Sequence, residues 1–294
     1  IFNIYSLDVL KNNYITDHSL KFQKIIFQRN KKGLIELIDL NFNKVTLPEK
    51  FKLKQEKDTM LHVLADHISD SQLCYHGSNT IVRIKRGLQI TSCLEFDLVV
   101  EKDELFIYHP PSKNINFTLL ELLKISRNAK SLWIDGKNIN IEDNCITLHN
   151  KLKEYKKIKD LNLDQKKIFI EFPSDTSLDN PSILSCIENM KLDNIDVSYY
   201  IPNEDIDICY NNLFESNEIC KKLINTASLI DEKKYFNNIS FDYKFSKILD
   251  KFNFKPRFLK LNTWHIDFDE VKDLDYESYN LVIPYNSNYN RNTF

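Results

Sequence analysis

The stretch Cys93–His109, which reads CLEFDLVVEKDELFIYH, decides the fold of this chain. Its first half alternates apolar residues with two acids, Glu95 and Asp97, so a strand here has one apolar face and one acidic face. Burying two carboxylates without a counter-charge is costly, so such acids favour a functional site over a structural one. In a parallel barrel the outer face of a strand packs on helices. The pattern therefore predicts a barrel strand whose two acids point inward.

Strand-like runs alternate with helix-like runs on either side of this stretch, from about residue 73 onward. The expected strands are 73–76, 93–100 with 105–109, 131–137, 167–172, 196–201, 239–245, 257–261 and 280–285. The expected helices are 117–126, with a capping-box pattern at Thr118 and Glu121, 181–190 after an Asn-Pro start, 211–224 and 245–252. Eight strand units joined by crossovers predict the α/β class and a (β/α)₈ TIM barrel. A doubly wound open sheet is the structural alternative.

Residues 1–70 do not show this alternation of strands and helices. Runs at 21–27, 33–41 and 44–53 suggest a few strands, and 58–68 reads as a short helix leading into the barrel. We therefore expect a small N-terminal extension or subdomain over 1–70 and the barrel over 71–294.

Composition excludes some classes of function. The chain has 294 residues, a formal charge of −2 and no dominant basic stripe, so nothing implies a nucleic-acid partner. The lysine-rich segment 151–167 is interpreted as the solvated face of a helix. No run approaches the roughly 20 apolar residues of a membrane span, and no signal peptide is visible. Because the chain starts at Ile1, a targeting or anchoring segment can have been removed. The protein is then periplasmic, cell-surface or membrane-associated, and otherwise cytoplasmic.

Cysteine and glycine usage carry two further expectations. The six cysteines have no CxxC spacing, which argues against a zinc site, and in a chain this long they do not read as a disulfide framework. We expect free, mostly buried thiols. There are only four glycines, and three of them (Gly77, Gly87 and Gly136) lie beside or within the motifs below. We expect them where a side chain cannot be tolerated.

Polar residues gather where the expected strands end, and in a barrel these ends form one mouth. His76 closes the first strand and His109 closes the extension of the second. Asp135 and Lys137 share a face of the third strand, as Glu95 and Asp97 do on the second. These six side chains are expected to cluster.

The chemistry of such a cluster is specific. Three carboxylates without a thiolate suit one divalent cation, Mg²⁺ or Ca²⁺, better than zinc. Two histidines can supply a general base and a general acid near pH 7, and a lysine adds a fixed positive charge for a phosphoryl oxygen. No GxSxG motif and no glycine-rich phosphate loop are present. The combination indicates phosphodiester cleavage rather than acyl transfer.

The sequence resembles the PLC-like phosphodiesterase superfamily, particularly the glycerophosphodiester phosphodiesterases. The resemblance rests on CYHGSNT at 74–80, LEFDLVVEKDELFIYH at 94–109 and TLLELL at 118–123, and it covers residues 73 to about 140. Two details are similar to other branches. His109-Pro110-Pro111 resembles the HPP of menorin-like proteins, and Asp135-Gly136-Lys137 resembles the D-x-K of menorin-like proteins and sphingomyelinase D enzymes.

The resemblance implies roles for these residues. It makes His76 and His109 the acid/base pair and places Lys137 near the phosphate. The implied metal ligands are Glu95, Asp97 and Asp135. In these families a substrate hydroxyl beside the phosphodiester can attack phosphorus and give a cyclic phosphate. One departure is Gly77, because glycerophosphodiester phosphodiesterases carry arginine directly after the first histidine.

The expected function is a metal-dependent phosphodiesterase that cleaves a glycerophosphodiester, a lysophospholipid or a phosphate-linked glycan. The alternative is a catalytically inactive barrel that binds lipid, glycan or a protein, and a purely structural module ranks third. The expected partner is a small-molecule or lipid-headgroup phosphodiester. Weaker candidates for substrate binding are Glu171, Trp264, Tyr285 and Arg291.

Overall fold

The computed structural model describes residues 3–4, 25–29, 35–39, 72–112, 115–211, 218–266 and 279–284. The chain divides into two units, Ile1–Leu64 with Asn286–Phe294, and Ala65–Tyr285. The described part of the first unit is an antiparallel sheet of β1 (Asn3–Ile4), β2 (Ile25–Arg29) and β3 (Ile35–Asp39). The expected strand at 44–53 and helix at 58–68 lie outside the described residues. The expected domain division at residue 70 stays a prediction.

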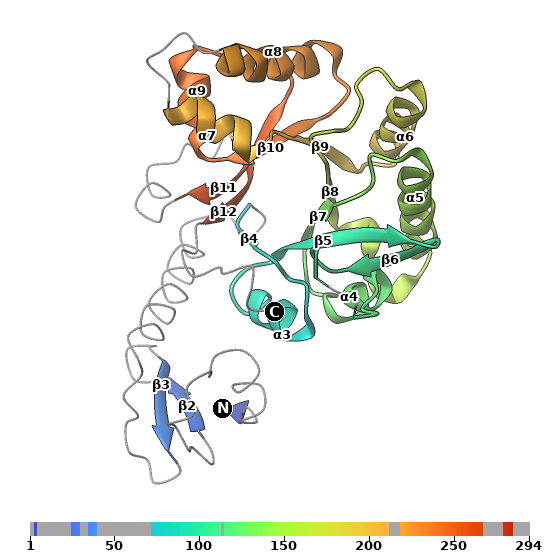
Figure 1. The fold of residues 1–294 in the computed structure, drawn as a ribbon. Coiled ribbons are helices and arrows are strands. Elements are labelled where there is room, and N and C mark those ends of the chain that lie inside the picture. The colour runs from blue at the N-terminus through green and yellow to red at the C-terminus, as the bar shows by residue number, and fades with distance from the viewer. Residues whose placement is uncertain are drawn as a thin grey trace. The chain divides into compact units, whose positions relative to one another are not determined.

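The second unit is built on eight parallel strands that pair in chain order (Figure 1). They are β4 (Cys74–Tyr75), β5 (Cys93–Glu101), β7 (Ser131–Gly136), β8 (Lys167–Phe172), β9 (Asp196–Tyr200), β10 (Asn238–Asp242), β11 (Lys260–Ile266) and β12 (Tyr279–Pro284). A parallel bridge between Leu73 and Val282 joins the last strand to the first, and the Val282 N–H donates to the Gln72 carbonyl at 2.8 Å. The sheet therefore closes almost completely on itself. The predicted α/β TIM barrel is confirmed, and the open doubly wound sheet is excluded.

Helices surround the strands, as the ribbon in Figure 1 shows. They are α3 (Ile81–Gly87), α4 (Leu119–Ile125), α5 (Glu142–Lys156), α6 (Pro181–Leu192), α7 (Asn203–Asn211), α8 (Glu218–Lys233) and α9 (Lys244–Lys251). The predicted capping box of α4 is present, with Thr118 and Glu121 each bonding the other's backbone N–H. A short strand, β6 (Glu104–Ile107), returns antiparallel along β5. None of these helices is both long and apolar enough to cross a bilayer.

Three elements depart by three residues or more from their predicted boundaries. The predicted strand 239–245 ends at Asp242, because α9 begins at Lys244, whose backbone N–H donates to Oδ1 of Asp242 at 3.0 Å. The predicted strand 257–261 is displaced to Lys260–Ile266. The Asp231 carboxylate accepts the backbone N–H groups of residues 257, 258 and 259 at 2.8–3.0 Å, so these groups cannot join the ladder. The predicted helix 211–224 is replaced by the end of α7 and the start of α8, with 212–217 outside the described residues.

The lysine-rich segment is not one solvated helical face. Helix α5 ends at Lys156, and two 3₁₀ turns follow at Lys159–Leu161 and Leu163–Gln165. Lys166 is buried, and its ammonium donates to the carbonyls of Ser126, Arg127 and Ala129. These carbonyls follow the end of α4, where a cation is favourable.

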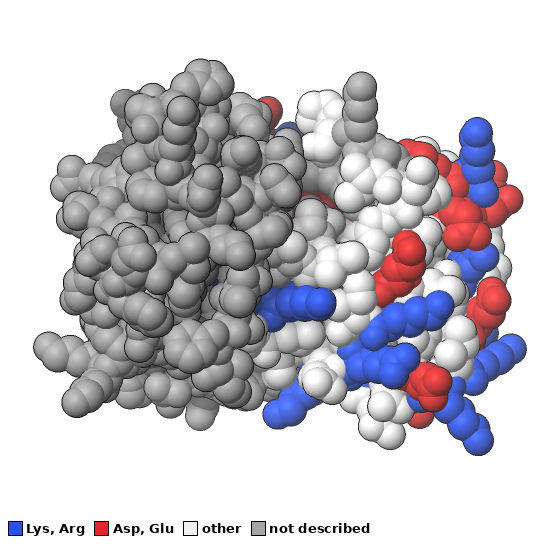
Figure 2. All heavy atoms as spheres, turned by 90° about the horizontal axis from the view of Figure 1, so that it is seen from below, with Lys and Arg blue, Asp and Glu red and all other residues white. Residues whose placement is uncertain are grey.

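The surface drawn in Figure 2 is of mixed charge. Over the described residues of this face, Lys and Arg side chains are interspersed with Asp and Glu. Ion pairs within one helix, such as Lys191–Glu188 at 2.6 Å and Lys221–Glu218 at 2.9 Å, are typical of a solvated helical surface.

The interpretation of the cysteines as free thiols is wrong. All six are buried, as expected, but they form the disulfides Cys74–Cys93, Cys145–Cys186 and Cys209–Cys220. The first joins β4 to β5, the second α5 to α6 and the third α7 to α8. Each pair brings together neighbours in the fold that are 11 to 41 residues apart in sequence, so no local spacing motif reveals it.

An alkylation experiment tests this pairing. Iodoacetamide added to the denatured, unreduced protein is expected to label none of the six cysteines, because no sulfur is a free thiol. After reduction, the intact mass should increase by six adducts. Labelling of all six without a reductant would restore the free-thiol interpretation.

Candidate active site

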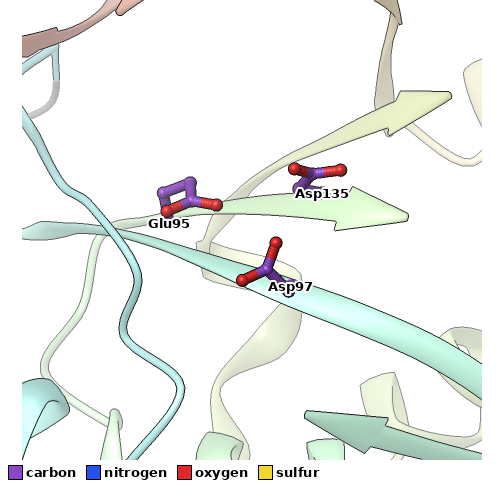
Figure 3. Close-up of side chains that lie close together, drawn as sticks. All are labelled: Glu95, Asp97 and Asp135. Carbon is purple, nitrogen blue, oxygen red and sulfur yellow. The ribbon is translucent and has the colours of Figure 1, made fainter. Parts of the chain in front are cut away.

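Three carboxylates from β5 and β7 converge (Figure 3). Glu95 and Asp97 are the third and fifth residues of β5, and Asp135 is the last but one of β7. Glu95 and Asp97 are 2% and 4% exposed, and Asp135 is the register partner of Asp97. One oxygen from each of the three groups lies within 4.8 Å of the others. The alternation in β5 thus places both acids inside the barrel, as predicted, and β7 adds the third.

Lys137 is the counter-charge of this acidic cluster. It follows β7 by one residue, and its ammonium nitrogen lies 2.8 Å from Oδ1 of Asp97 and also donates to Oδ2 of Asp135. Burial alone would lower the pKa of Lys137, but the two carboxylates raise it well above its ordinary value. The ammonium therefore keeps its charge at any physiological pH.

The three acids do not share this counter-charge equally. Burial raises the pKa of Glu95 well above its usual range, and Asp97 and Asp135 raise it further. Burial also raises the pKa of Asp135, and the Asp97 charge adds to this against the opposing effect of Lys137. For Asp97, Lys137, His109 and Asn79 outweigh burial and lower the pKa. Three acids facing one ammonium leave an excess of negative charge, and their all-oxygen donor set fits a hard divalent cation.

The turn after β4 holds the two acids of β5 from the other side. The Gly77 N–H donates to Oε2 of Glu95 at 2.5 Å. The Asn79 side chain donates to Oδ2 of Asp97 at 2.5 Å and accepts from the Asp97 backbone N–H at 2.9 Å. Asn79 is 6% exposed. The sequence placed Asn79 in the CYHGSNT motif but did not predict that it orients Asp97.

The turn after His76 depends on Gly77 and Arg83. Gly77 has φ 65°, a left-handed conformation that a side chain disfavours. The guanidinium of Arg83, on α3, donates to the carbonyl of His76 at 2.6 Å and to that of Gly77. An arginine thus braces this turn from a position that the sequence analysis did not single out.

The two candidate histidines lie beside different acids. Nε2 of His76 is 3.5 Å from Oε2 of Glu95, and the His76 side chain is 34% exposed. His109, two residues after β6, is partly exposed, and its charge lowers the pKa of both Asp97 and Asp135. Lys137 and His109 both interact electrostatically with the Asp97 and Asp135 carboxylates, and His76 lies beside Glu95. All six residues of the predicted cluster therefore lie together.

Of the four weaker candidates, the structure describes Glu171 and Trp264. Glu171 is the register partner of Asp135 on β8 and is 4% exposed. Burial and the Asp135 charge raise the pKa of Glu171 to about 8, and its Oε2 has no hydrogen-bond partner among the described residues. Trp264 lies within β11 rather than after it, buried against Trp133 with ring centroids 6.0 Å apart. Tyr285 and Arg291 lie outside the described residues.

Comparisons with known proteins find similarity in structure alone. No protein-family model matches the sequence, and no curated protein matches it. A phosphodiesterase from Oleispira antarctica, solved with the product sn-glycerol-3-phosphate, is 12% identical with a TM-score of 0.46, over 72% of this chain and 92% of its own. A protein of Silicibacter pomeroyi assigned as a glycerophosphoryl diester phosphodiesterase is 10% identical with a TM-score of 0.43, over 72% and 88%.

Removal of the Asn79 amide should destabilise the fold. Asn79→Ala removes the donor to Oδ2 of the buried Asp97 carboxylate, which keeps its contact with Lys137, and also removes the acceptor of the Asp97 N–H. We therefore expect the free energy of unfolding in urea to fall by about 2–4 kcal/mol. Asn144→Ala is the matched control, because it removes one partly buried side-chain hydrogen bond, to the Asn138 carbonyl, that involves none of the acids. That variant should lose about 1 kcal/mol. Equal losses in the two variants would contradict a special role for Asn79.

Replacement of Glu171 should change how stability depends on pH. In the folded chain the Glu171 pKa is about 8, whereas in the unfolded chain it is near the ordinary 4.3. Between these values the unfolded state gives up the proton and the folded state keeps it, so stability falls as pH rises. In EDTA, the wild type should lose on the order of 3 kcal/mol more than Glu171→Gln between pH 5 and pH 8. Parallel urea titrations with equal losses would show that the Glu171 pKa is ordinary.

Proposed function

We propose that this chain is a metal-dependent phosphodiesterase. The observation that carries the proposal is the convergence of two buried carboxylates (Glu95 and Asp97), a partly buried one (Asp135) and one lysine, with two histidines beside them, near the end of the parallel pairing of β5 with β7. This is the end of a TIM barrel at which catalytic residues are found. The sequence resemblance over residues 73 to about 140 supports the same reaction.

In this proposal one divalent cation, Mg²⁺ or Ca²⁺, is held by Glu95, Asp97 and Asp135. The fit is supported by the oxygen-only donor set and by the burial and mutual repulsion that raise the pKa of Glu95 and Asp135. When bound, such an ion neutralises charge on a phosphoryl oxygen. Asn79 and the Gly77 N–H then orient two of the three ligands, as outer partners commonly do at metal sites.

The remaining steps belong to the side chains of this chain. One of His76 and His109 takes the proton from the attacking hydroxyl, and the other donates a proton to the departing oxygen. Lys137 keeps a full positive charge toward the phosphoryl group, since the carboxylates beside it raise its pKa. If the hydroxyl belongs to the substrate, the P–O bond to the leaving group breaks as a cyclic phosphate forms. If it belongs to water, a phosphomonoester forms.

The proposed substrate is a glycerophosphodiester, a lysophospholipid or a phosphate-linked glycan. Glu171 is the best supported of the four substrate-binding candidates, because its unpartnered oxygen is buried next to Asp135 in the sheet. Trp264, Tyr285 and Arg291 stay predictions. Three disulfides favour an oxidising compartment such as the periplasm or a cell surface over the cytoplasm.

A barrel that binds its ligand without cleaving it is the second candidate. It is favoured by the turn after His76, where Gly77 supplies no cationic side chain. Arg83 lies close by, but its guanidinium is bonded to the backbone carbonyls of that turn. A site with one cation fewer would stabilise charge on a phosphoryl transition state less well.

Hydrolysis assays distinguish the two candidates. Glycerophosphocholine, lysophosphatidylcholine and bis-p-nitrophenyl phosphate are offered with Mg²⁺ or Ca²⁺, and turnover is measured for the wild type and for His76→Ala and His109→Ala. Each variant should lose about 10²–10⁴-fold in kcat, the usual contribution of an acid or base. His149→Ala is the control, because that histidine bonds Asp193 elsewhere on the barrel, and it should keep its activity.

Metal titration completes this test. EDTA should abolish turnover, and Asp97→Asn should weaken Mg²⁺ binding in calorimetry. Metal binding without turnover of any substrate would favour the binding protein. Neither binding nor turnover would overturn both candidates.

A further inference from the structure

One of the three disulfides lies inside the barrel, directly below the acidic site. Cys74 on β4 and Cys93 on β5 are register partners in neighbouring parallel strands, and their sulfurs are bonded. Two residues further along each chain segment come His76 and Glu95, whose Nε2 and Oε2 atoms lie 3.5 Å apart. Side chains two residues apart in a strand share a face. Glu95 therefore shares the inward face of β5 with Cys93, and His76, the first residue after β4, lies beside it.

We propose that the Cys74–Cys93 disulfide is a positioning element of the active site, which holds β4 in register with β5 so that His76 faces Glu95. The proposal rests on the proposed function for the roles of these two residues. The geometry that the disulfide maintains belongs to the structure itself, whatever reaction the site performs.

β4 needs such a bond because its backbone pairing is short. It is two residues long, and its ladder with β5 is limited to Cys74–Cys93 and Tyr75–Leu94. β5, by contrast, pairs with β7 continuously from Cys93–Ser131 to Leu98–Gly136. On its other side β4 is joined through the single bridge Leu73–Val282. Of the barrel strands that the structure describes, β4 therefore has the shortest backbone ladder to hold its register; just after it, the Ser78 N–H donates to the Glu95 carbonyl at 2.7 Å.

The hydrogen bonds made by the turn after β4 depend on the register of that strand. Through this turn the Gly77 N–H reaches Glu95 and the Asn79 amide reaches Asp97, each at 2.5 Å. A slip of one residue would turn every side chain of β4 to the opposite face. It would carry His76 away from Glu95 and leave the two buried carboxylates of β5 without these donors. A covalent link at Cys74–Cys93 prevents that slip.

The other two disulfides provide a comparison within the same molecule. Cys145–Cys186 joins α5 to α6, and Cys209–Cys220 joins α7 to α8. None of the site residues lies on these four helices. Cys74 and Cys93 are 1% and 0% exposed and pack with Trp133 and Trp264, so their bond is a permanent part of the folded interior rather than a surface thiol switch.

The experiment compares two double variants. Cys74→Ala/Cys93→Ala removes the interior disulfide, and Cys145→Ala/Cys186→Ala removes the helical one. The control disulfide joins residues 41 apart in sequence, whereas the interior disulfide joins residues 19 apart. Loop entropy alone should therefore destabilise the control variant at least as much as the interior variant. At saturating Mg²⁺ and below both melting temperatures, the interior variant should lose about 10- to 100-fold in kcat, with KM within about threefold. Its Kd for Mg²⁺ should rise by about tenfold. The control variant should stay within about twofold of the wild type in kcat, in KM and in the Kd for Mg²⁺.

Equal kcat, KM and Mg²⁺ affinity in the two variants would overturn the proposal. If the interior variant does not fold, as judged by circular dichroism, Cys74→Val/Cys93→Ala refills part of the lost volume and is measured in the same way.

A readout that needs no activity separates this inference from the proposed function. The imidazole ¹⁵N chemical shifts of His76 are recorded in EDTA for both double variants. They should change in the interior variant and not in the control. If the wild type shows no turnover and binds no metal, the proposed function fails while these shifts still decide the positioning role. Unchanged shifts in the interior variant would overturn it.

Discussion

The burial of Glu95 and Asp97 inside the barrel is the constraint on which the rest of the site depends. A carboxylate removed from water needs hydrogen-bond donors or a cation, since burial without them costs several kcal/mol. Three polar neighbours of these two acids meet that need. Lys137 comes from the end of β7, while the Gly77 N–H and the Asn79 amide come from the turn after β4. These donors reach only part of the acidic charge, which is why the pKa of Glu95 stays raised.

The interior of the barrel is arranged in two levels along the strands. On the inward face, the residue two places before three of the four acids belongs to the apolar cluster: Cys93 before Glu95, Trp133 before Asp135 and Phe169 before Glu171. The cluster excludes water from below the acids, and Trp264 and Tyr200 extend it with stacked rings whose centroids are 5.5 Å apart. In such surroundings each ion pair is stronger than it would be in water, and each unpaired charge is more costly. The same packing therefore explains both the fixed charge of Lys137 and the raised pKa of Glu171.

The part of the chain predicted best from sequence is the part whose signals are local. The alternation in β5, the capping box at Thr118 and the start of α6 after Asn180 each depend on residues within one element, and all three are present. The boundaries that were misplaced depend on distant partners. The Asp231 carboxylate, on α8, takes the N–H groups that would have started β11 earlier. Lys166 is buried for the same kind of reason, because the carbonyls that it bonds follow α4, nearly 40 residues earlier in the chain.

By itself, the sequence determined the class of fold, the inward direction of Glu95 and Asp97, and the gathering of the six candidate residues at one end of the barrel. It could do so because strand periodicity and the geometry of parallel sheets follow from short-range order. Only the tertiary structure decided how those acids are held. The Asn79 and Gly77 hydrogen bonds, the bracing by Arg83 and the three disulfides all join residues by their positions in space. The cysteines show the difference most plainly: their burial follows from their type, but their pairing follows from which strands and helices become neighbours.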